Sequence, residues 1–297
     1  MTATATLPTT SRSCPAPAST PLPPSSGSPL TAAYTRLTEA YPGLRVEERS
    51  AALGAPSEDG WFSAAELAAD PGALDSFLDF DETQVRRDYG QSARPDVVAS
   101  FGLHRYAWPA CLLVTVPWFL HRRVPRLPVS SVSVHRASGR MSVHIDTFAC
   151  LPEDPAAALP GAEVVADEEA LRTRVRASVA EHLQPLLEGF GPRMRRGRRA
   201  LWGTATDEIV EGLWYVGQLL GEGPRAMVEL ERLLPGRTAP YTGAAGFRTL
   251  VGPQGQELPT RNRASCCLFY TIRPRDTCTT CPRTCDADRI GRLTDSP

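Results

Sequence analysis

The chain has 297 residues, of which 42% are hydrophobic and 22% charged, and its formal net charge is −1. This composition is typical of a soluble globular protein with one large domain or two smaller ones. A charge so near zero produces no field that would attract nucleic acid or an anionic membrane, which excludes both as the main partner. All 32 basic residues are arginine, so an arginine can indicate a site only through its position.

The first 29 residues consist largely of Ser, Thr, Pro and Ala. Low hydrophobicity and frequent proline predict a disordered tail over residues 1–29. No basic stretch precedes an apolar one there, so we expect no secretory signal and a cytoplasmic location, including the inner face of the plasma membrane. Because the cytosol keeps thiols reduced, the cysteines are expected to be metal or redox ligands.

The N-terminal third shows helical patterns. Residues 30–41 have helical spacing of apolar side chains, and Ser63 with Glu66 forms a capping-box pattern that opens a short helix. A second short helix is predicted over residues 71–80. Residues 106–120 are the most apolar run, but a membrane-spanning helix needs roughly 20 such residues. We therefore expect a buried core segment there and no transmembrane segment.

The clearest β signal comes next. Residues 129–135 and 141–148 alternate between polar and apolar side chains and flank a turn that contains glycine. This pattern predicts an antiparallel β-hairpin. His135 and His144 would then lie near each other across the hairpin, a pairing that is more often a surface feature than a metal site.

Further helices are predicted in the second half. Asp167 is a good N-cap for a long helix, and His182 lies on its apolar face, where a hydrogen-bonded core histidine is expected. Another long helix is predicted over residues 200–220, followed by a shorter one. Residues 151–166 and 235–260 are rich in Gly, Pro or Ala, which predicts a loop and a linker or irregular segment.

Five arginines lie within residues 193–199. One interpretation is a solvated basic turn. The other is the rim of an anion-binding pocket, because guanidinium groups pair well with carboxylate and hydroxamate-type oxygens. The chain has no glycine-rich nucleotide loop and no nucleophile elbow in a convincing context, so it shows no sign of binding NAD or hydrolysing a nucleotide.

Five of the eight cysteines lie within residues 261–293, and four of them read Cys266-Cys267-x10-Cys278-x2-Cys281. Structural zinc sites draw their thiolates from two C-x2-4-C pairs. Only one pair here has that spacing, and the adjacent pair would need a kinked backbone to reach one ion. A [2Fe-2S] cluster distributes four thiolates over two irons, so the chemistry favours iron–sulfur over zinc and leaves both open.

The run Ser265-Cys266-Cys267-Leu-Phe-Tyr, with Cys278 and Cys281 after it, resembles the C-terminal signature of the FhuF-type ferric-siderophore reductases. That family carries a [2Fe-2S] cluster on the same C-C-x10-C-x2-C pattern. The close resemblance covers about the last 30 residues. It implies that the cluster ligands are the four cysteines of the pattern: Cys266, Cys267, Cys278 and Cys281.

The resemblance also implies an enzyme, a cytoplasmic ferric-siderophore reductase that passes one electron to the Fe(III) complex and releases Fe(II). Its substrate would be a ferric siderophore, and a ferredoxin or a flavin-dependent reductase would donate the electron. No catalytic residue is expected beyond the cluster. Two alternatives stay open: a non-enzymatic siderophore- or partner-binding protein with a structural zinc, and an iron–sulfur redox sensor.

Residues around the cysteines receive expected roles as well. Cys285 lies outside the pattern and is expected to be a free surface thiol. Three neighbours are expected to shield one side of the cluster from water: Leu268, Phe269 and Tyr270. Four arginines are expected to offset the negative charge of the cluster: Arg263, Arg273 and the two that flank the second cysteine pair, Arg275 and Arg283.

The expected fold class is α+β, with a helical body, a central antiparallel β-hairpin or sheet and a small irregular C-terminal iron–sulfur segment. The expected divisions are a disordered tail (1–29), a substrate-binding body (30–260) and a [2Fe-2S]-binding segment (261–297). Folding of the last segment is expected to depend on its metal.

Overall fold

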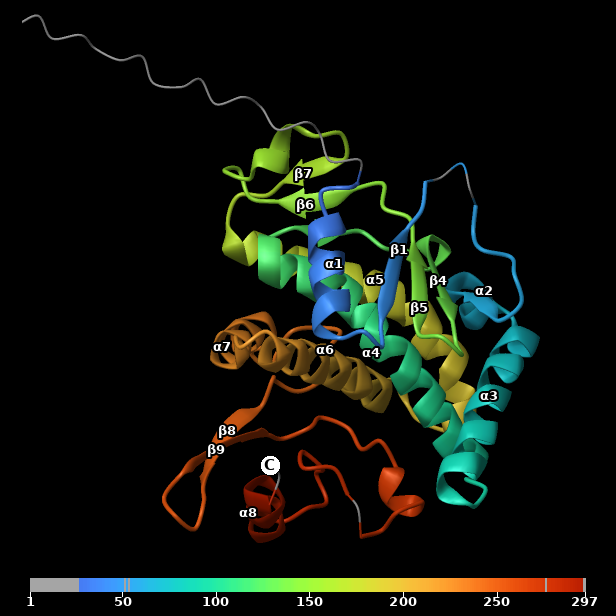
Figure 1. Cartoon of the computed structure of the whole chain (residues 1–297), viewed down its shortest axis with the longest axis vertical. Helices are drawn as coiled ribbons and strands as arrows, with labels where there is room; N and C mark the ends of the chain where they lie inside the picture. Colours follow the sequence, from blue (N-terminus) through green and yellow to red (C-terminus); the bar gives the residue numbers. More distant parts are fainter. Residues whose placement is uncertain (1–26, 51, 53, 276, 296–297) are drawn as a thin grey trace, which may run out of the picture.

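The structure, a computed structural model, describes residues 27–50, 52, 54–275 and 277–295. The predicted tail lies outside the described residues as far as residue 26. The fold is α+β, as predicted, with three long helices at its centre (Figure 1). Helix α4 (Pro95–His121) packs against both α5 (Glu168–Met194) and α6 (Arg198–Leu219). Helix α7 (Gly223–Leu233) covers α6.

Helix α4 is the core of the molecule. It contains the predicted apolar run 106–120, and all but a few of its side chains are buried. By length and composition it is the one helix of the described residues that could cross a membrane, but 78% of its apolar window is buried inside the structure. A helix that is apolar on every side is expected at such a position, surrounded by other elements.

The N-terminal helices pack beside this core. Helix α1 (Thr31–Ala40) matches the predicted helix, and the capping box of Ser63 and Glu66 opens α2 (Ala64–Ala69) as predicted. The short helix predicted over 71–80 is wrong in length, because α3 runs over Pro71–Tyr89. Its buried side chains continue at helical spacing to Val85, and Gly90, with a left-handed φ of 66°, ends the helix.

The predicted hairpin is confirmed but shorter than expected. Strands β4 (Val132–His135) and β5 (Arg140–Val143) pair antiparallel within a four-stranded sheet of order β1-β5-β4-β2, completed by β1 (Arg45–Glu48) and β2 (Trp61–Ser63). The register places His135 opposite Arg140, beside the turn, whereas His144 follows the other end of β5. The two histidines therefore lie at opposite ends of the hairpin and form no pair.

A second, three-stranded sheet contains elements that the sequence did not reveal. Strand β6 (Phe148–Cys150) pairs with β3 (Val124–Pro125) and with β7 (Ala162–Val164). The predicted 151–166 loop thus includes a short strand. The prediction of an irregular segment over 235–260 is also wrong in part. Strands β8 (Phe247–Val251) and β9 (Glu257–Arg261) form an antiparallel hairpin there, which ends one residue beyond the predicted range. The two short strands of this hairpin pair mainly with each other. They therefore lack the alternation of buried and exposed side chains by which a strand is recognised in a sequence.

His182 is the core histidine that the sequence predicted. It is 3% exposed, and its Nδ1 lies 2.7 Å from the carbonyl oxygen of Leu127 while its Nε2 lies 2.8 Å from the hydroxyl of Tyr106. The carbonyl can only accept, so Nδ1 carries the proton and Nε2 accepts from the tyrosine. Burial lowers the pKa of His182 to about 4, against which the hydrogen bond to Leu127 acts only partly.

This histidine should make stability depend on pH. Between about pH 6.5 and about pH 4 the unfolded chain takes up a proton that the folded chain does not, so we expect the free energy of unfolding to fall by up to about 3 kcal/mol as pH drops through this window. Urea unfolding of the wild type and of His182→Asn at several pH values would isolate the effect, because the other titrating groups cancel in the difference. A difference that stays constant with pH would contradict the assignment.

Candidate metal centre

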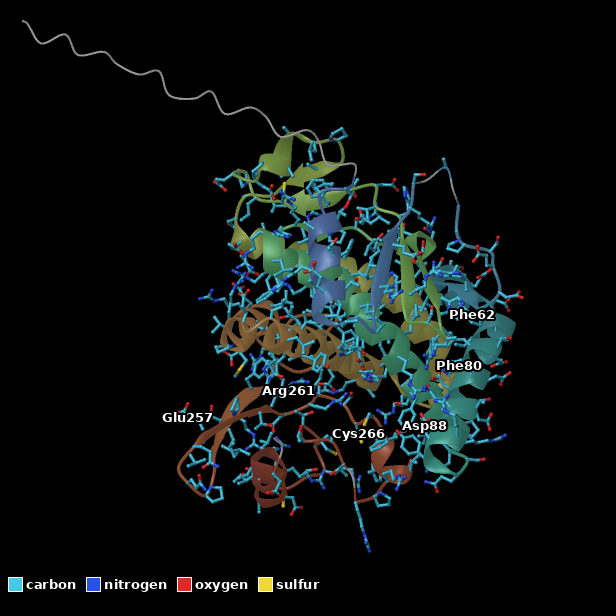
Figure 2. The ribbon with its side chains drawn as sticks, viewed as in Figure 1. Phe62, Phe80, Asp88, Glu257, Arg261 and Cys266 are labelled. Atoms are coloured by element: carbon cyan, nitrogen blue, oxygen red, sulfur yellow. The ribbon has the colours of Figure 1, made fainter. Side chains whose placement is uncertain are left out.

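The C-terminal segment packs as a layer along α6, below it in Figure 1. Strand β9 ends at Arg261, and irregular backbone then carries the cysteines to α8 (Asp286–Asp295). In the view of Figure 2, Cys266 lies between Arg261 and Asp88, the latter near the end of α3. The next residue, Cys267, contacts the helical body, because its carbonyl oxygen accepts the hydroxyl of Ser100 on α4 at 3.3 Å.

Asp207 on α6 fixes the backbone that leads to the first cysteine pair. Its carboxylate is fully buried, and Oδ1 accepts hydrogen bonds from the guanidinium of Arg261 (2.7 Å) and the N–H of Ala264 (2.9 Å). Oδ2 accepts from the N–H (2.8 Å) and the hydroxyl (2.7 Å) of Ser265. All these donors lie in the five residues before Cys266, so one carboxylate determines how the chain approaches the site.

Glu211, one turn further along α6, connects the two cysteine pairs. Its Oε1 accepts from Arg261 (3.0 Å) and from the hydroxyl of Thr280 (2.8 Å). Thr280 lies between Cys278 and Cys281. A single helix thus positions the approach to the first pair and the turn that contains the second.

Helix α8 holds the segment from the other side. Arg289 is 1% exposed and donates to the carbonyl oxygens of Arg261 (3.0 Å) and Cys281 (3.1 Å). Arg292 donates to the carbonyl oxygen of Thr277. These arginines satisfy backbone acceptors in a stretch that has no regular secondary structure to do so.

An apolar contact anchors the middle of the segment. Phe269, in the short helix η4 (Phe269–Thr271), packs edge-to-face on Tyr89 of α3 and lies beside Phe101 of α4, with ring centroids 5.6 and 6.1 Å apart. Ile272 is buried in the same small cluster. The expected shielding role of Phe269 therefore agrees with its position.

The sulfur atoms of Cys267 and Cys278 face each other. Their side chains share a hydrogen bond, although ten residues separate them in the chain. Cys281 is 3% exposed, and its sulfur accepts the N–H of Arg283 at 3.5 Å. N–H donors to sulfur are a common feature of iron–sulfur sites, where they stabilise the charged thiolate.

The backbone bends directly after the adjacent cysteines. Leu268, next to Cys267, has a φ of 65°, a left-handed conformation that is uncommon for residues other than glycine. Such a conformation costs roughly 1–2 kcal/mol. The change of direction therefore follows the adjacent cysteines, which themselves lie outside any strand.

The local environment favours a thiolate. The hydrogen bond from Cys278 lowers the pKa of Cys267, an effect to which the N–H of Phe269 and the charge of Arg263 add, and the same contact raises the pKa of Cys278. The thiolate is the form of cysteine that binds metals.

Of the four arginines expected to offset the cluster charge, Arg263 lines the same cavity as this pair. It lines a cavity together with Cys267 and Cys278, and its Nε lies 3.5 Å from Asp207. Its pKa is raised because the nearby carboxylates outweigh the effect of burial. Arg263 is thus the best positioned of the arginines expected to offset cluster charge.

The other three arginines that were expected to offset the cluster charge are Arg273, Arg275 and Arg283. Arg283 lies over the ring of Tyr270 at 4.1 Å, and Arg273 lies over Tyr89 at 5.6 Å. Arg275 is exposed, and its carbonyl oxygen accepts from α8. Their influence on the cluster stays a prediction.

The space beside the thiols suits a small cluster. A cavity of about 350 Å³ is lined by both facing cysteines, by Arg263 and by three aromatic rings, those of Tyr89, Phe101 and Phe269. Among the described residues, no three His, Cys, Asp or Glu side chains converge as ligands of a single ion would. A [2Fe-2S] cluster divides its thiolates between two irons. Two of the four predicted ligands, Cys267 and Cys278, line this cavity with an apolar wall and a compensating guanidinium, which fit one side of such a cluster, whereas Cys266 and Cys281 do not line it.

These features define the site of an iron–sulfur protein. The sequence profile of a known family, described as the FhuF 2Fe-2S C-terminal domain, matches residues 263–283. The C-terminal segment is therefore of the FhuF type, as the resemblance suggested, and its cofactor is a [2Fe-2S] cluster. A search of curated proteins returned no match to the chain.

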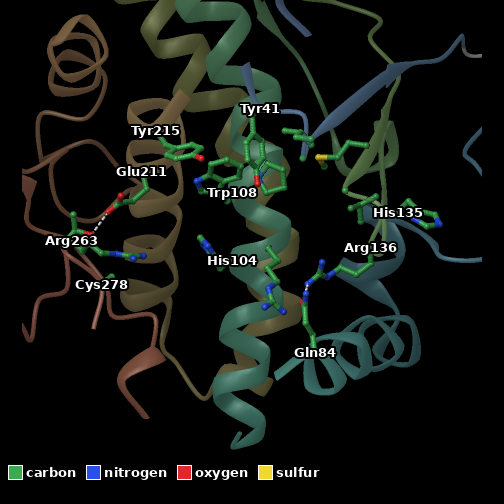
Figure 3. A pocket seen from close by; sticks show the side chains of 18 of the residues that line it. Tyr41, Gln84, His104, Trp108, His135, Arg136, Glu211, Tyr215, Arg263 and Cys278 are labelled. Atoms are coloured by element: carbon green, nitrogen blue, oxygen red, sulfur yellow. Dashed lines mark hydrogen bonds between the residues drawn. The ribbon is translucent and has the colours of Figure 1, made fainter. Parts of the chain in front are cut away.

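A second cavity, of about 550 Å³, begins at the cysteine segment and extends along α4 to the four-stranded sheet. Figure 3 shows Cys278 on one side of it and Arg136 with His135 on the other. His104 lines both cavities, and its Nδ1 lies 2.7 Å from the buried carboxylate of Glu208. The two cavities therefore meet at four shared lining residues, His104, Arg105, Arg263 and Cys278.

The arginine-rich segment 193–199 lies elsewhere. Arg195, Arg196 and Arg198 line a separate cavity of about 450 Å³ that contains no cysteine, and Arg193 pairs with Asp75 at 2.7 Å. The segment is therefore not the rim of the cavity beside the cysteines.

Four residues that hold the segment in place were not predicted from the sequence: Asp207, Glu211, Arg261 and Arg289. One signal was available: Asp207 and Glu211 are four residues apart within residues 200–221, a stretch that contains no basic residue. Buried charges are rare unless they are paired, so these acids indicated buried cationic partners.

Proposed function

We propose that this protein is a cytoplasmic one-electron reductase of ferric siderophores, with the cluster held by Cys266, Cys267, Cys278 and Cys281. The observation that supports it best is the position of Cys278 on the wall of the 550 Å³ cavity. That volume is in the range of small-molecule sites. A ferric chelate bound there would lie directly beside a cluster ligand.

The chemistry asks little of the chain beyond binding and shielding. When bound, the cluster supplies one electron to the Fe(III) of the chelate. Siderophores hold Fe(III) through hard oxygen donors and Fe(II) far less tightly, so the reduced iron is released. The cavity residues orient the chelate, and Phe269 shields the thiolates from water. No general acid, base or nucleophile is required.

The proposal divides the chain into a substrate-binding body (30–260) and a cluster-binding segment (261–297). An external donor, a ferredoxin or a flavin-dependent reductase, restores the electron after each turnover. The chain would work in the cytoplasm, including the inner face of the plasma membrane, where siderophores arrive.

Anaerobic spectroscopy of the purified protein tests the proposal. We expect a red-brown protein whose visible absorption bleaches with dithionite and returns when a ferric siderophore is added, with Fe(II) appearing in step in a ferrozine assay. The gallium(III) complex of the same siderophore cannot accept the electron and should leave the protein reduced. A colourless zinc protein, or a reduced cluster that no ferric siderophore reoxidises, would refute the reductase.

A further inference from the structure

The 550 Å³ cavity has one wall built of aromatic rings. Tyr41 at the end of α1, Trp108 on α4 and Tyr215 on α6 form a three-ring group. Their centroids are 5.4 Å (Tyr41–Trp108), 5.8 Å (Tyr41–Tyr215) and 5.9 Å (Trp108–Tyr215) apart. Three helices each contribute one ring, and Tyr215 remains 43% exposed. A surface of this kind favours a ligand that itself contains aromatic rings.

The part of the cavity next to the sheet is cationic. Arg105 of α4 and Arg136, directly after β4, both donate to the same oxygen of Asp81, a fully buried carboxylate. Neither guanidinium has a second carboxylate partner among the residues that the structure describes. Two positive charges against one negative charge leave this end of the cavity with an excess of about one positive charge.

Arg136 is a largely buried cation of the cavity lining. Its guanidinium lies over the ring of Phe80 at 4.8 Å and is 87% buried, with a side-chain exposure of 13%. Its Nε is buried and has no hydrogen-bond acceptor within the described part of the chain. This N–H is buried inside the protein, so Arg136 contributes to the cavity through its charge.

The third part of the cavity is the cysteine end, formed by Cys278, Thr279 and Thr280 together with the guanidinium of Arg263. The two threonines present hydroxyl and backbone groups, and no carboxylate of the cavity lining is free there, because Glu211 is engaged by Arg261 and Thr280. The iron of a bound chelate would thus lie toward Cys278, with its organic part along the rings and its anionic oxygens toward Arg105 and Arg136.

From these three features we infer that the cavity between α4, the four-stranded sheet and the cysteine segment is the substrate site, and that it selects anionic ferric chelates whose oxygen donors are carried on aromatic rings, that is, catecholates or phenolates. This inference rests on the proposed function for the identity of the ligand as a ferric chelate. Catecholate complexes of Fe(III) carry net negative charge and flat rings, and so match both the cationic end and the aromatic wall. An aliphatic tris-hydroxamate complex of positive charge matches neither.

Redox-inert analogues test binding separately from electron transfer. The probes are the gallium(III) complexes of enterobactin, a tris-catecholate, and of desferrioxamine B, an aliphatic tris-hydroxamate, titrated into the cluster-loaded protein by calorimetry. We expect the catecholate complex to bind at least about tenfold more tightly than the hydroxamate complex. A cation–π contact between an arginine and a catecholate ring, together with the one excess positive charge of the cavity, is enough for that factor.

Three variants sharpen the test. Arg136→Gln should weaken catecholate binding by about tenfold and change hydroxamate binding by no more than about twofold, because only the anionic ligand uses the charge. Tyr215→Leu, at an exposed ring, provides a second variant should Arg136→Gln fail to fold with its cluster. Arg195→Gln, in the separate arginine-lined cavity, is the matched control and should leave both affinities unchanged.

Equal affinity for both probes, tighter hydroxamate binding, or a loss caused by Arg195→Gln and not by Arg136→Gln would overturn the inference. These results differ from a failure of the proposed function. A protein that reduces ferric desferrioxamine B and prefers its gallium complex is still a reductase, whereas one that reduces no ferric siderophore fails as a reductase whatever the gallium complexes show.

Discussion

Asp207→Asn protein is expected to purify with less than about one-fifth of the wild-type content of iron and acid-labile sulfide, since breaking a buried ion pair costs about 3–5 kcal/mol. Asp207 contacts no sulfur atom. It accepts from Arg261, Ala264 and Ser265 and so fixes the residues before Cys266. In the variant, the amide nitrogen would replace one carboxylate oxygen and would face groups that are themselves donors. Arg261 would also remain buried without its full counter-charge.

The matched control is Asp286→Asn. This carboxylate of the C-terminal segment also pairs with an arginine, Arg248 of β8, but it is 52% exposed. Surface ion pairs contribute little to stability, so its iron content should stay near that of the wild type. Circular dichroism should show the helical body folded in both variants. Full iron and sulfide content in Asp207→Asn, with the same resistance to chelators, would show that the anchor is dispensable.

Cys278→Ser is expected to abolish the visible absorption of the cluster, whereas Cys285→Ser should retain it. Cys278 faces Cys267 and lines both cavities. Cys285 is exposed and directly precedes α8, where its carbonyl oxygen accepts the N–H of Arg289 at 3.0 Å. Serine is a good helix N-cap, so its substitution there should preserve α8.

Absorption and electron paramagnetic resonance of the dithionite-reduced variants would measure the outcome, with iron and sulfide assays for stoichiometry. The comparison is sharp because both substitutions exchange one sulfur for one oxygen, 7 residues apart by their numbering in the same segment. Equal loss in both variants would mean that Cys285 is a ligand and that the proposed ligand set is wrong.

Local sequence signals predicted those elements whose cause is local. The capping box of Ser63 and Glu66, the N-cap at Asp167 and the alternation around β4 and β5 each depend on residues within a few positions of one another. Errors arose where distant packing extends or creates an element. Helix α3 continues beyond residue 80 because its side chains keep meeting the core, and β8 with β9 form a hairpin that no alternating pattern marks.

The cofactor could be predicted from the sequence, because the C-C-x10-C-x2-C pattern lies within 16 residues of chain and resembles that of a known [2Fe-2S] family, whereas the donor chemistry alone left zinc open. The surroundings of the cluster could not. Asp207 lies about 60 residues before the cysteines, and Arg136 more than 140 before Cys278. Only the tertiary structure brings each of these charged residues to the cysteine segment or to the cavity beside it. Buried ion pairs and cavity walls depend on distances in space, which spacing along the chain does not determine.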